Sequence, residues 1–306
     1  MKERREGTMD DDWHDEEHER NRSSVAYAAP GGLTLHMRSR AGLGSCTHVE
    51  PAGVLLDCGT LPRDVRSSFR DVPRARHVFL THTHIDHAAA APLYAHYHAR
   101  AGRAPVFHVP APALPAFTAF MDAALRMGTN TEDDYADDTA ATDAPQYTAV
   151  GVRPGDVVRL PAPSPYRVRV FATCHGVPSV GYGLERVTGR TTTGDDGDGD
   201  DDGDDDGEAV ERLLLYTGDT TIAALARGHE AMLRYAAVVH DCTFLTGRAP
   251  ARLHGHTAYP QLAPFIATTP HIAWFLQHLS LTNYTRKRQL RLPSPLPPNV
   301  TFVGLC

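Results

Sequence analysis

Short apolar runs alternate with amphipathic segments along most of this 306-residue chain. Apolar runs bounded by turn residues predict strands over 32–37, 48–50, 54–59, 76–82, 104–110, 156–160, 166–175, 180–187, 212–220, 235–244, 271–278 and 299–305, with a hairpin turn at 51–53. Apolar residues at helical spacing predict helices over 88–103 and 113–127, and further helices that begin at 221, 257 and 283. Because strands and helices alternate, the fold class is α/β or α+β.

Three polar segments interrupt this pattern. Residues 1–20 hold nine acidic and four basic residues, and residues 195–208 hold ten acidic and no basic residues. Such segments cannot bury enough apolar surface to fold. We therefore predict a disordered acidic tail at 1–24 and one domain over 25–306, with a disordered acidic insertion at 191–210 in a hairpin connection. Residues 129–145 are also polar and acidic, which predicts a mobile loop.

Charge and composition narrow the location and the partners. The acidic tail and the acidic run carry −5 and −10 of a total charge of −7, so the rest of the chain carries +8. This excess suits an anionic ligand such as nucleic acid, although a solvated mixed surface explains it equally well. No apolar run approaches the roughly 20 residues of a membrane span, and the N-terminus is too charged for a signal peptide. We expect a cytoplasmic or nuclear protein with no membrane partner.

Four metal-type side chains follow the predicted strand at 76–82. In the stretch "FLTHTHIDH", His82 and His84 alternate at an extended strand end, and both can face the same way. Asp86 and His87 begin the helix that follows, so they can face the same point from its first turn. Unsatisfied polar groups are costly to bury, by about 1 to 3 kcal/mol each. Four ligands at this spacing therefore indicate a metal site rather than a structural core.

Further donors stand at the ends of other predicted strands. They are His175 after "RVFATC", Asp219 in "YTGDT" and His278 after "IAWFLQ". Alone, each histidine could be a satisfied structural residue, and Asp219 could cap the helix that follows it. Their shared placement at strand ends favours ligation.

Six blocks of sequence carry a resemblance to a known family. The blocks are "LTHTHIDHAAAAPL", "HGVPSVGY", "YTGDT", "VVHDCTF", "HGHTAY" and "FLQHLSLTNY". They occur in the family's order, and the resemblance as a whole extends over roughly residues 34–306. The chain resembles the metallo-β-lactamase superfamily and, within it, the short form of ribonuclease Z, a tRNA 3′-processing endonuclease. The resemblance implies an α+β fold, an αββα sandwich of two mixed sheets flanked by helices.

The same resemblance assigns the ligands to two Zn²⁺ ions, although His and Asp ligands also suit Mn²⁺ or Fe²⁺. The first ion takes His82, His84 and His175, the second takes Asp86, His87 and His278, and Asp219 bridges the two. In this family the ions hold a hydroxide that attacks the phosphodiester. Asp86 would orient that water or take its proton.

The resemblance also implies a proton donor for the leaving oxygen. His256 in "HGHTAY" matches the donor and Asp241 in "HDCTF" matches the acidic residue that holds it, with His254 as the rival donor. Three features depart from the family pattern. Asp241 stands where the family has Glu, Asn283 replaces an arginine, and no basic RNA-gripping arm is recognisable, since residues 131–138 are acidic.

The function implied by the resemblance is a zinc-dependent endoribonuclease that cleaves the 3′ trailer from precursor tRNA, its expected partner. The sequence leaves open whether the protein forms a homodimer. One alternative is another hydrolase of this fold that acts on a small phosphodiester or thioester. A second alternative is a non-catalytic RNA-binding relative, against which the complete ligand set argues.

Overall fold

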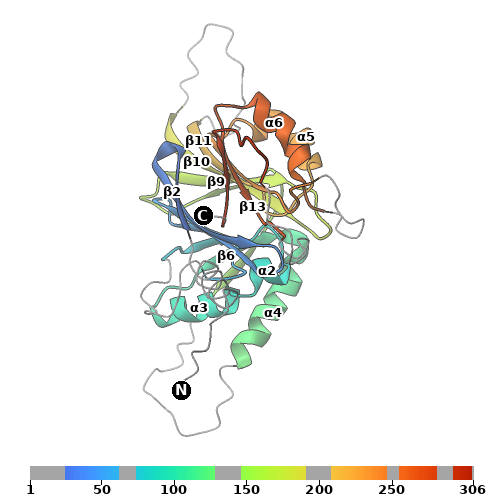
Figure 1. Cartoon of the computed structure of the whole chain (residues 1–306). Coiled ribbons are helices and arrows are strands. Elements are labelled where there is room, and N and C mark those ends of the chain that lie inside the picture. The colour runs from blue at the N-terminus through green and yellow to red at the C-terminus, as the bar shows by residue number, and fades with distance from the viewer. Residues whose placement is uncertain are drawn as a thin grey trace, which may run out of the picture.

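Two sheets with helices on their outer faces form the protein (Figure 1). The computed structural model describes residues 25–61, 74–127, 146–190, 208–246, 255–280 and 292–304. Over these residues each sheet has seven strands, and each combines parallel and antiparallel pairs. The predicted arrangement of two mixed sheets flanked by helices is therefore confirmed.

The first sheet contains the N-terminal strands in chain order. Its strands are β1 (Val25–Ala29), β2 (Leu33–Arg40), β3 (Gly44–Glu50), β4 (Val54–Leu56), β5 (His77–Phe79), β6 (Val106–Pro110) and β7 (Thr148–Val152). The pairs from β1 to β4 are antiparallel, and those from β4 to β7 are parallel. The helices between these strands are α2 (Ile85–Ala88), α3 (Ala91–Arg100) and α4 (Leu114–Met127).

The second sheet holds the remaining strands, again with neighbours in chain order. Its strands are β8 (Val157–Arg159), β9 (Tyr166–Ala172), β10 (Val180–Arg190), β11 (Glu208–Tyr216), β12 (Ala237–Asp241), β13 (Ala273–Gln277) and β14 (Val300–Phe302). β8 to β11 pair antiparallel, and β11 to β14 pair parallel. Helices α5 (Ala223–Met232) and α6 (Tyr259–Thr268) follow β11 and β12.

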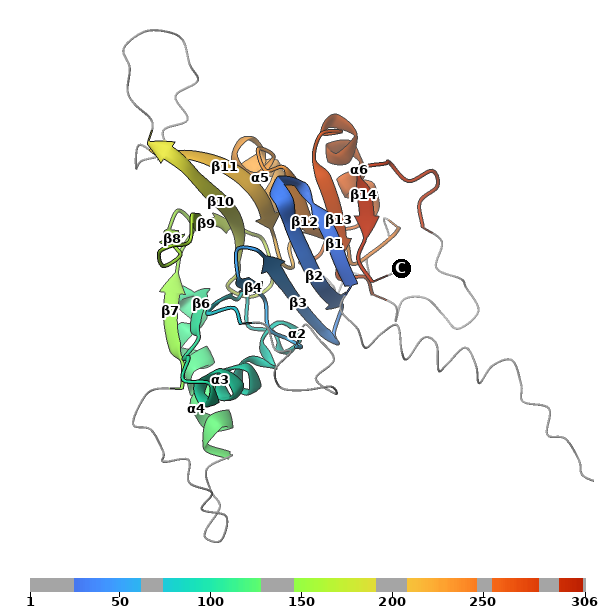
Figure 2. The same cartoon turned by 90° about the vertical axis from the view of Figure 1, so that its left-hand side faces the viewer.

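The core lies in three layers. On β2, buried Leu33, Leu35 and Met37 alternate with partly exposed residues and pack against the second sheet. Figure 2 shows α3 and α4 beside the first sheet, with α5 and α6 on the far side of the second. Each set of helices covers a separate apolar cluster, one containing Tyr94 and Phe107, the other containing Trp274.

Several sequence predictions are corrected or refined here. Strands β1 and β7 are present although neither was predicted. The hairpin around the acidic insertion is as predicted, since β10 and β11 pair out to Arg190 and Glu208. However, β11 begins at Glu208, so residues 208–210 belong to a strand and not to the insertion.

Other predicted segments fall outside the described residues. They are the acidic tail 1–24, the acidic loop 131–138, residues 191–207, His254 and the helix predicted from 283. Among the described helices, none is long and apolar enough to cross a membrane.

Strand directions bring the predicted site residues together. β9 and β11 both run antiparallel to β10, so they point the same way, and β12 and β13 run parallel to β11. The carboxyl ends of all four strands therefore meet at one edge of the second sheet. In the first sheet, β4 and β5 are parallel and also end together.

Candidate metal centre

The structure brings all seven predicted metal ligands together. His82 and His84 follow β5, Asp86 and His87 lie in α2, and the others follow β9, β11 and β13. Their ligand atoms fall into overlapping groups in which every atom lies within 4.8 Å of the others. These groups are His82–His84–His175, His82–His87–Asp219 and Asp86–His87–His278. The part of the chain that the structure describes thus contains a His/Asp centre able to hold a metal.

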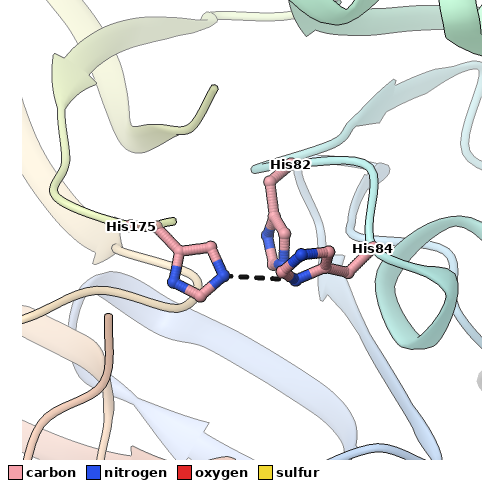
Figure 3. A group of neighbouring side chains, drawn as sticks. All are labelled: His82, His84 and His175. Carbon is pink, nitrogen blue, oxygen red and sulfur yellow. Dashed lines mark hydrogen bonds between the residues drawn. The ribbon is translucent and has the colours of Figure 1, made fainter. Parts of the chain in front are cut away.

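The first group consists of three histidines whose ring nitrogens converge (Figure 3). Nδ1 of His84 lies 3.1 Å from Nε2 of His82 and 3.2 Å from Nε2 of His175. Two ligands that each lie about 2.0–2.1 Å from one tetrahedral ion are about 3.3 Å apart. The spacing of these nitrogens therefore matches ligation of one ion.

Asp219 lies between this group and the second one. Its Oδ2 is 3.8 Å from Nε2 of His82, 3.3 Å from Nε2 of His87 and 3.2 Å from Nε2 of His278. Oδ2 of Asp86 lies 3.4 Å from the same Nε2 of His278. Asp219 therefore contacts both groups, as a bridging ligand must.

The hydrogen bonds around His82 and His87 fix which nitrogen of each ring is bare. The Thr81 hydroxyl donates to Asp57, so it accepts the Nδ1 proton of His82 across 3.1 Å. Asp57 also accepts the Nδ1 proton of His87 at 2.8 Å. Each ring then turns an unprotonated Nε2 towards the centre, since neutral imidazole carries one proton.

His175 and His278 are oriented in the same way. Nδ1 of His175 donates to the carbonyl of Gly255 at 2.8 Å. The Thr243 hydroxyl donates to Oδ1 of Asp241 at 2.7 Å, and so it accepts the Nδ1 proton of His278 at 2.9 Å. The Nε2 lone pairs of both rings are left facing the centre.

These contacts provide a test of whether the residues fit a metal ion. Lone pairs of four histidine Nε2 atoms face each other and the oxygens of two carboxylates, which are acceptors only. Nε2 of His87 and Oδ1 of Asp219 are buried without a hydrogen-bond partner. Acceptors gathered without donors require a cation, because buried polar groups otherwise go unpaired. The donor set of imidazole and carboxylate suits Zn²⁺, Mn²⁺ or Fe²⁺.

The pKa shifts of the ligands follow the charges around them. Burial alone would lower the pKa of His87, but the charges of Asp219 and Asp57 outweigh burial, so the net pKa is raised. The acceptors around this ring thus attract positive charge, which an ion bound there would supply. Burial lowers the pKa of His82 and of His175, which keeps both rings neutral. Burial alone would raise the pKa of Asp86, but its contacts with His278, His87 and the Gly42 N–H outweigh burial, so the net pKa is lowered. Asp86 is therefore ionised at neutral pH.

A histidine–carboxylate pair stands next to the ligands. Nδ1 of His256, which precedes α6, lies 2.9 Å from Oδ2 of Asp241, the buried last residue of β12. Burial lowers the pKa of His256, but the hydrogen bond and charge of Asp241 outweigh it, so the net pKa is raised. The predicted pair is therefore in contact, whereas its rival His254 lies outside the described residues.

A pocket of about 630 Å³ opens over the centre. His84, Asp86, Asp219, His256 and His278 line it, so four of the ligands and His256 face the same space. The turn between β2 and β3 completes its wall with residues 40–43. From this turn, the Gly42 N–H donates to Oδ2 of Asp86 at 2.8 Å.

Comparisons with known proteins identify the fold that carries this site. No family model and no curated protein matches the chain in sequence. A metallo-β-lactamase fold protein from Bacillus subtilis, YhfI, matches with a TM-score of 0.51 at 14% identity, over 81% of this chain and 86% of YhfI. Unliganded yeast PDE1 matches with a TM-score of 0.52 at 11% identity, over 91% of this chain and 90% of PDE1. The chain has the metallo-β-lactamase fold.

The short form of human tRNase Z also matches, over 86% of this chain and 92% of tRNase Z. Its TM-score is 0.49 at 16% identity, which is too low to support a functional assignment. At these identities the likeness concerns the metallo-β-lactamase fold alone. The resemblance to ribonuclease Z and the ligand roles stay predictions from the sequence.

Two residues of the centre were not predicted. Asp57 follows β4 and binds Thr81, His87 and the Tyr216 hydroxyl, which donates to Oδ2 across 3.0 Å. Thr243 links Asp241 to His278. Asp57 (φ 58°) and His278 (φ 66°) are also the two non-glycine residues with positive φ among those described. Such strained conformations gather at functional sites. An Asp directly after the apolar run "VLL" was the available signal for Asp57.

Proposed function

We propose that the protein is a metal-dependent phosphodiesterase that cleaves RNA, with the 3′ trailer of precursor tRNA as its substrate. The observation that carries the proposal is the His256–Asp241 pair, in contact at 2.9 Å, with His256 lining the same pocket as four of the ligands. Phosphodiester hydrolysis releases an alkoxide, which is a poor leaving group unless an acid protonates it. A thioester releases a stable thiolate and has less need of such an acid.

His256 is arranged to supply that proton. Its Nδ1 proton is held by Asp241, so Nε2 is the atom left to exchange a proton with a bound substrate. The raised pKa of His256 increases the fraction of the ring that is protonated at neutral pH. Thr243 donates to Asp241 through its hydroxyl and its backbone N–H, which holds the carboxylate in place.

The seven ligands would hold one or two divalent ions. A divalent ion bound there would act as a Lewis acid on the phosphoryl oxygen and lower the pKa of water. Asp86 is ionised, lies in the pocket and is fixed by the Gly42 N–H. Its carboxylate can orient a water molecule towards the phosphorus or accept its proton.

The RNA assignment is supported by features of the sequence and the pocket. The block "HGVPSVGY" resembles ribonuclease Z, and the chain outside the acidic tail and acidic run carries +8. Arg40 adds a cation to the pocket wall, where a phosphate would lie. The second candidate function is hydrolysis of a small phosphodiester. The pocket volume of about 630 Å³ favours it, because such volumes are typical of small-molecule sites.

A three-substrate assay tests the proposal. The zinc-loaded protein is compared on a precursor tRNA transcript, on bis-p-nitrophenyl phosphate and on a thioester. We expect cleavage of the transcript at the start of the 3′ trailer, slower diester hydrolysis and little thioester hydrolysis. Asp219→Ala is the control: it should lose metal as well as rate, because Asp219 lies between both ligand groups.

The other outcomes identify the alternatives. Hydrolysis of small diesters without transcript cleavage would assign the second candidate function. Fast thioester hydrolysis with no diester cleavage would overturn the phosphodiesterase proposal. A fully metal-loaded protein that binds RNA but cleaves nothing would indicate a non-catalytic relative.

A further inference from the structure

A second group of metal-type side chains lies on β2 and β3, away from the centre described above. The register pairs His36 with His48 directly across the two strands. Glu50 follows two residues after His48 and therefore lies on the same face of β3. His36 alternates with Leu35 and Met37, which pack into the core, so it faces outward from β2.

The donor atoms of this group converge. Oε2 of Glu50 lies 3.2 Å from Nε2 of His36, and Oε1 lies 3.8 Å from Nδ1 of His48. All three ligand atoms lie within 4.8 Å of one another. The two rings are stacked, with centroids 5.8 Å apart and an interplanar angle of 26°.

We propose that His36, His48 and Glu50 form a second metal site, which binds one divalent transition ion such as Zn²⁺ or Ni²⁺. Two imidazoles and one carboxylate are a donor set that such ions take. Two ligands of one tetrahedral ion are about 3.3 Å apart, close to the 3.2 Å between His36 and Glu50.

The distance between Glu50 and His48 indicates metal ligation rather than a hydrogen bond. Glu50 could accept a hydrogen bond from His36, but the 3.8 Å between Glu50 and His48 is too long for one. An ion between the three side chains spans such a gap by drawing the ligands in. The exposed fractions of these side chains are 15% for His36, 9% for His48 and 48% for Glu50. The open side admits an ion and leaves room for water ligands.

The site is distinct from the centre that carries the proposed hydrolase function. It shares no residue with the seven ligands of that centre. His36 is also four residues from Arg40, the nearest β2 residue in the pocket wall, or about 13 Å along an extended strand. An ion there would join adjacent strands and stabilise the folded state, since it binds a site that the unfolded chain lacks.

Counting bound ions tests the inference. The full-length protein is freed of metal with a chelator, dialysed against micromolar Zn²⁺ and analysed for zinc per chain by mass spectrometry. His36→Ala should bind one ion fewer than the wild type, and Glu50→Gln should bind that ion about tenfold more weakly or worse. The matched control is His271→Ala, which removes an exposed histidine elsewhere and should bind as the wild type does.

Two further comparisons distinguish binding at this site from binding at the proposed catalytic centre. Asp219→Ala should retain the ion held by His36, whatever happens at the proposed catalytic centre. Zinc should also raise the melting temperature of Asp219→Ala, and adding His36→Ala should remove that rise. Equal stoichiometry and affinity in wild type, His36→Ala and Glu50→Gln would overturn the inference, as would binding that needs millimolar zinc. The test uses His36→Ala and Glu50→Gln and does not depend on changing His48, which is buried.

Discussion

Asp241 holds His256 through a 2.9 Å contact with Nδ1 and, with its other oxygen, accepts the Thr243 hydroxyl and backbone N–H. The Thr220 N–H donates to the same carboxylate at 3.2 Å. A buried carboxylate with this many donors is fixed in position. The orientation of the His256 ring therefore follows from the end of β12 and not from the loop that carries it.

The first prediction concerns the leaving group. His256→Ala should lower the cleavage rate of an RNA diester by about 10² to 10⁴, because a general acid contributes this much. The defect should shrink on bis-p-nitrophenyl phosphate, whose leaving group needs little protonation. Metal content should equal that of the wild type. Equal losses on both substrates, or loss of metal, would remove His256 from the role of acid.

The second prediction concerns Asp57, which touches no substrate and acts through His87. Asp57→Asn places an amide N–H₂ where Thr81, Tyr216 and His87 all donate, so His87 loses its fixed orientation. Loss of such a supporting contact typically costs 10- to 100-fold in metal affinity. Equilibrium dialysis against zinc measures the change. Asp156→Asn, an exposed acid that accepts the Arg153 N–H, is the control. Unchanged affinity in Asp57→Asn would contradict the role.

The third prediction tests the close approach of backbone under the ligand helix. A Cβ on Gly59 would overlap the carbonyl of Asp86 and lie 2.7 Å from the backbone N of His87. Backbone atoms cannot swing aside, so Gly59→Ala should displace α2 and lose both metal and stability. At Gly189 a Cβ meets nothing within 4 Å, and Gly189→Ala should behave as the wild type. Melting temperatures and zinc per chain compare the two variants. A Gly59→Ala protein with normal metal content would show that α2 can shift freely.

The sequence predicted the centre well where its residues follow apolar strands. His82 and His84 are neighbours in sequence, so their convergence needs only local geometry. His175, Asp219 and His278 were found because each stands at the end of a predicted strand. Asp57 follows an apolar run, but its role depends on contacts with Thr81 and Tyr216 that only the folded chain makes.

The missed elements have physical reasons. β1 is a five-residue strand, "VAYAA", next to the acidic tail, and small residues give little periodic signal. β7, "TAVGV", contains a glycine and lies at the edge of its sheet beside a polar segment. The pairing of His36 with His48 was also invisible, because a shift of one residue in register would turn one of them to the opposite face.

The last prediction concerns the pH dependence of stability and a buried histidine outside both metal sites. His108 on β6 is buried, stacks on Phe79 at 4.4 Å and lies 3.0 Å from His77 through Nε2. Burial, and then the neighbouring His77, lower the pKa of His108 to about 3 from 6.5. Between these two values the unfolded chain takes up a proton that the folded protein does not. Stability from this group is therefore complete above pH 6.5 and falls as the pH falls towards 3.

Urea unfolding in the presence of a chelator, at pH 7 and at pH 5, measures this term. Across this interval His108 should cost the wild type about 2 kcal/mol of unfolding free energy. His108→Phe keeps the stacking surface but cannot take up a proton. At pH 7 this variant should be less stable than the wild type, because His77 loses its contact with His108. On going to pH 5, however, its unfolding free energy should fall by about 2 kcal/mol less than that of the wild type. His271→Gln, which changes an exposed histidine, should keep the slope of the wild type. Parallel losses in wild type and His108→Phe would mean that His108 can be protonated in the folded state, and that burial on β6 does not hold it neutral.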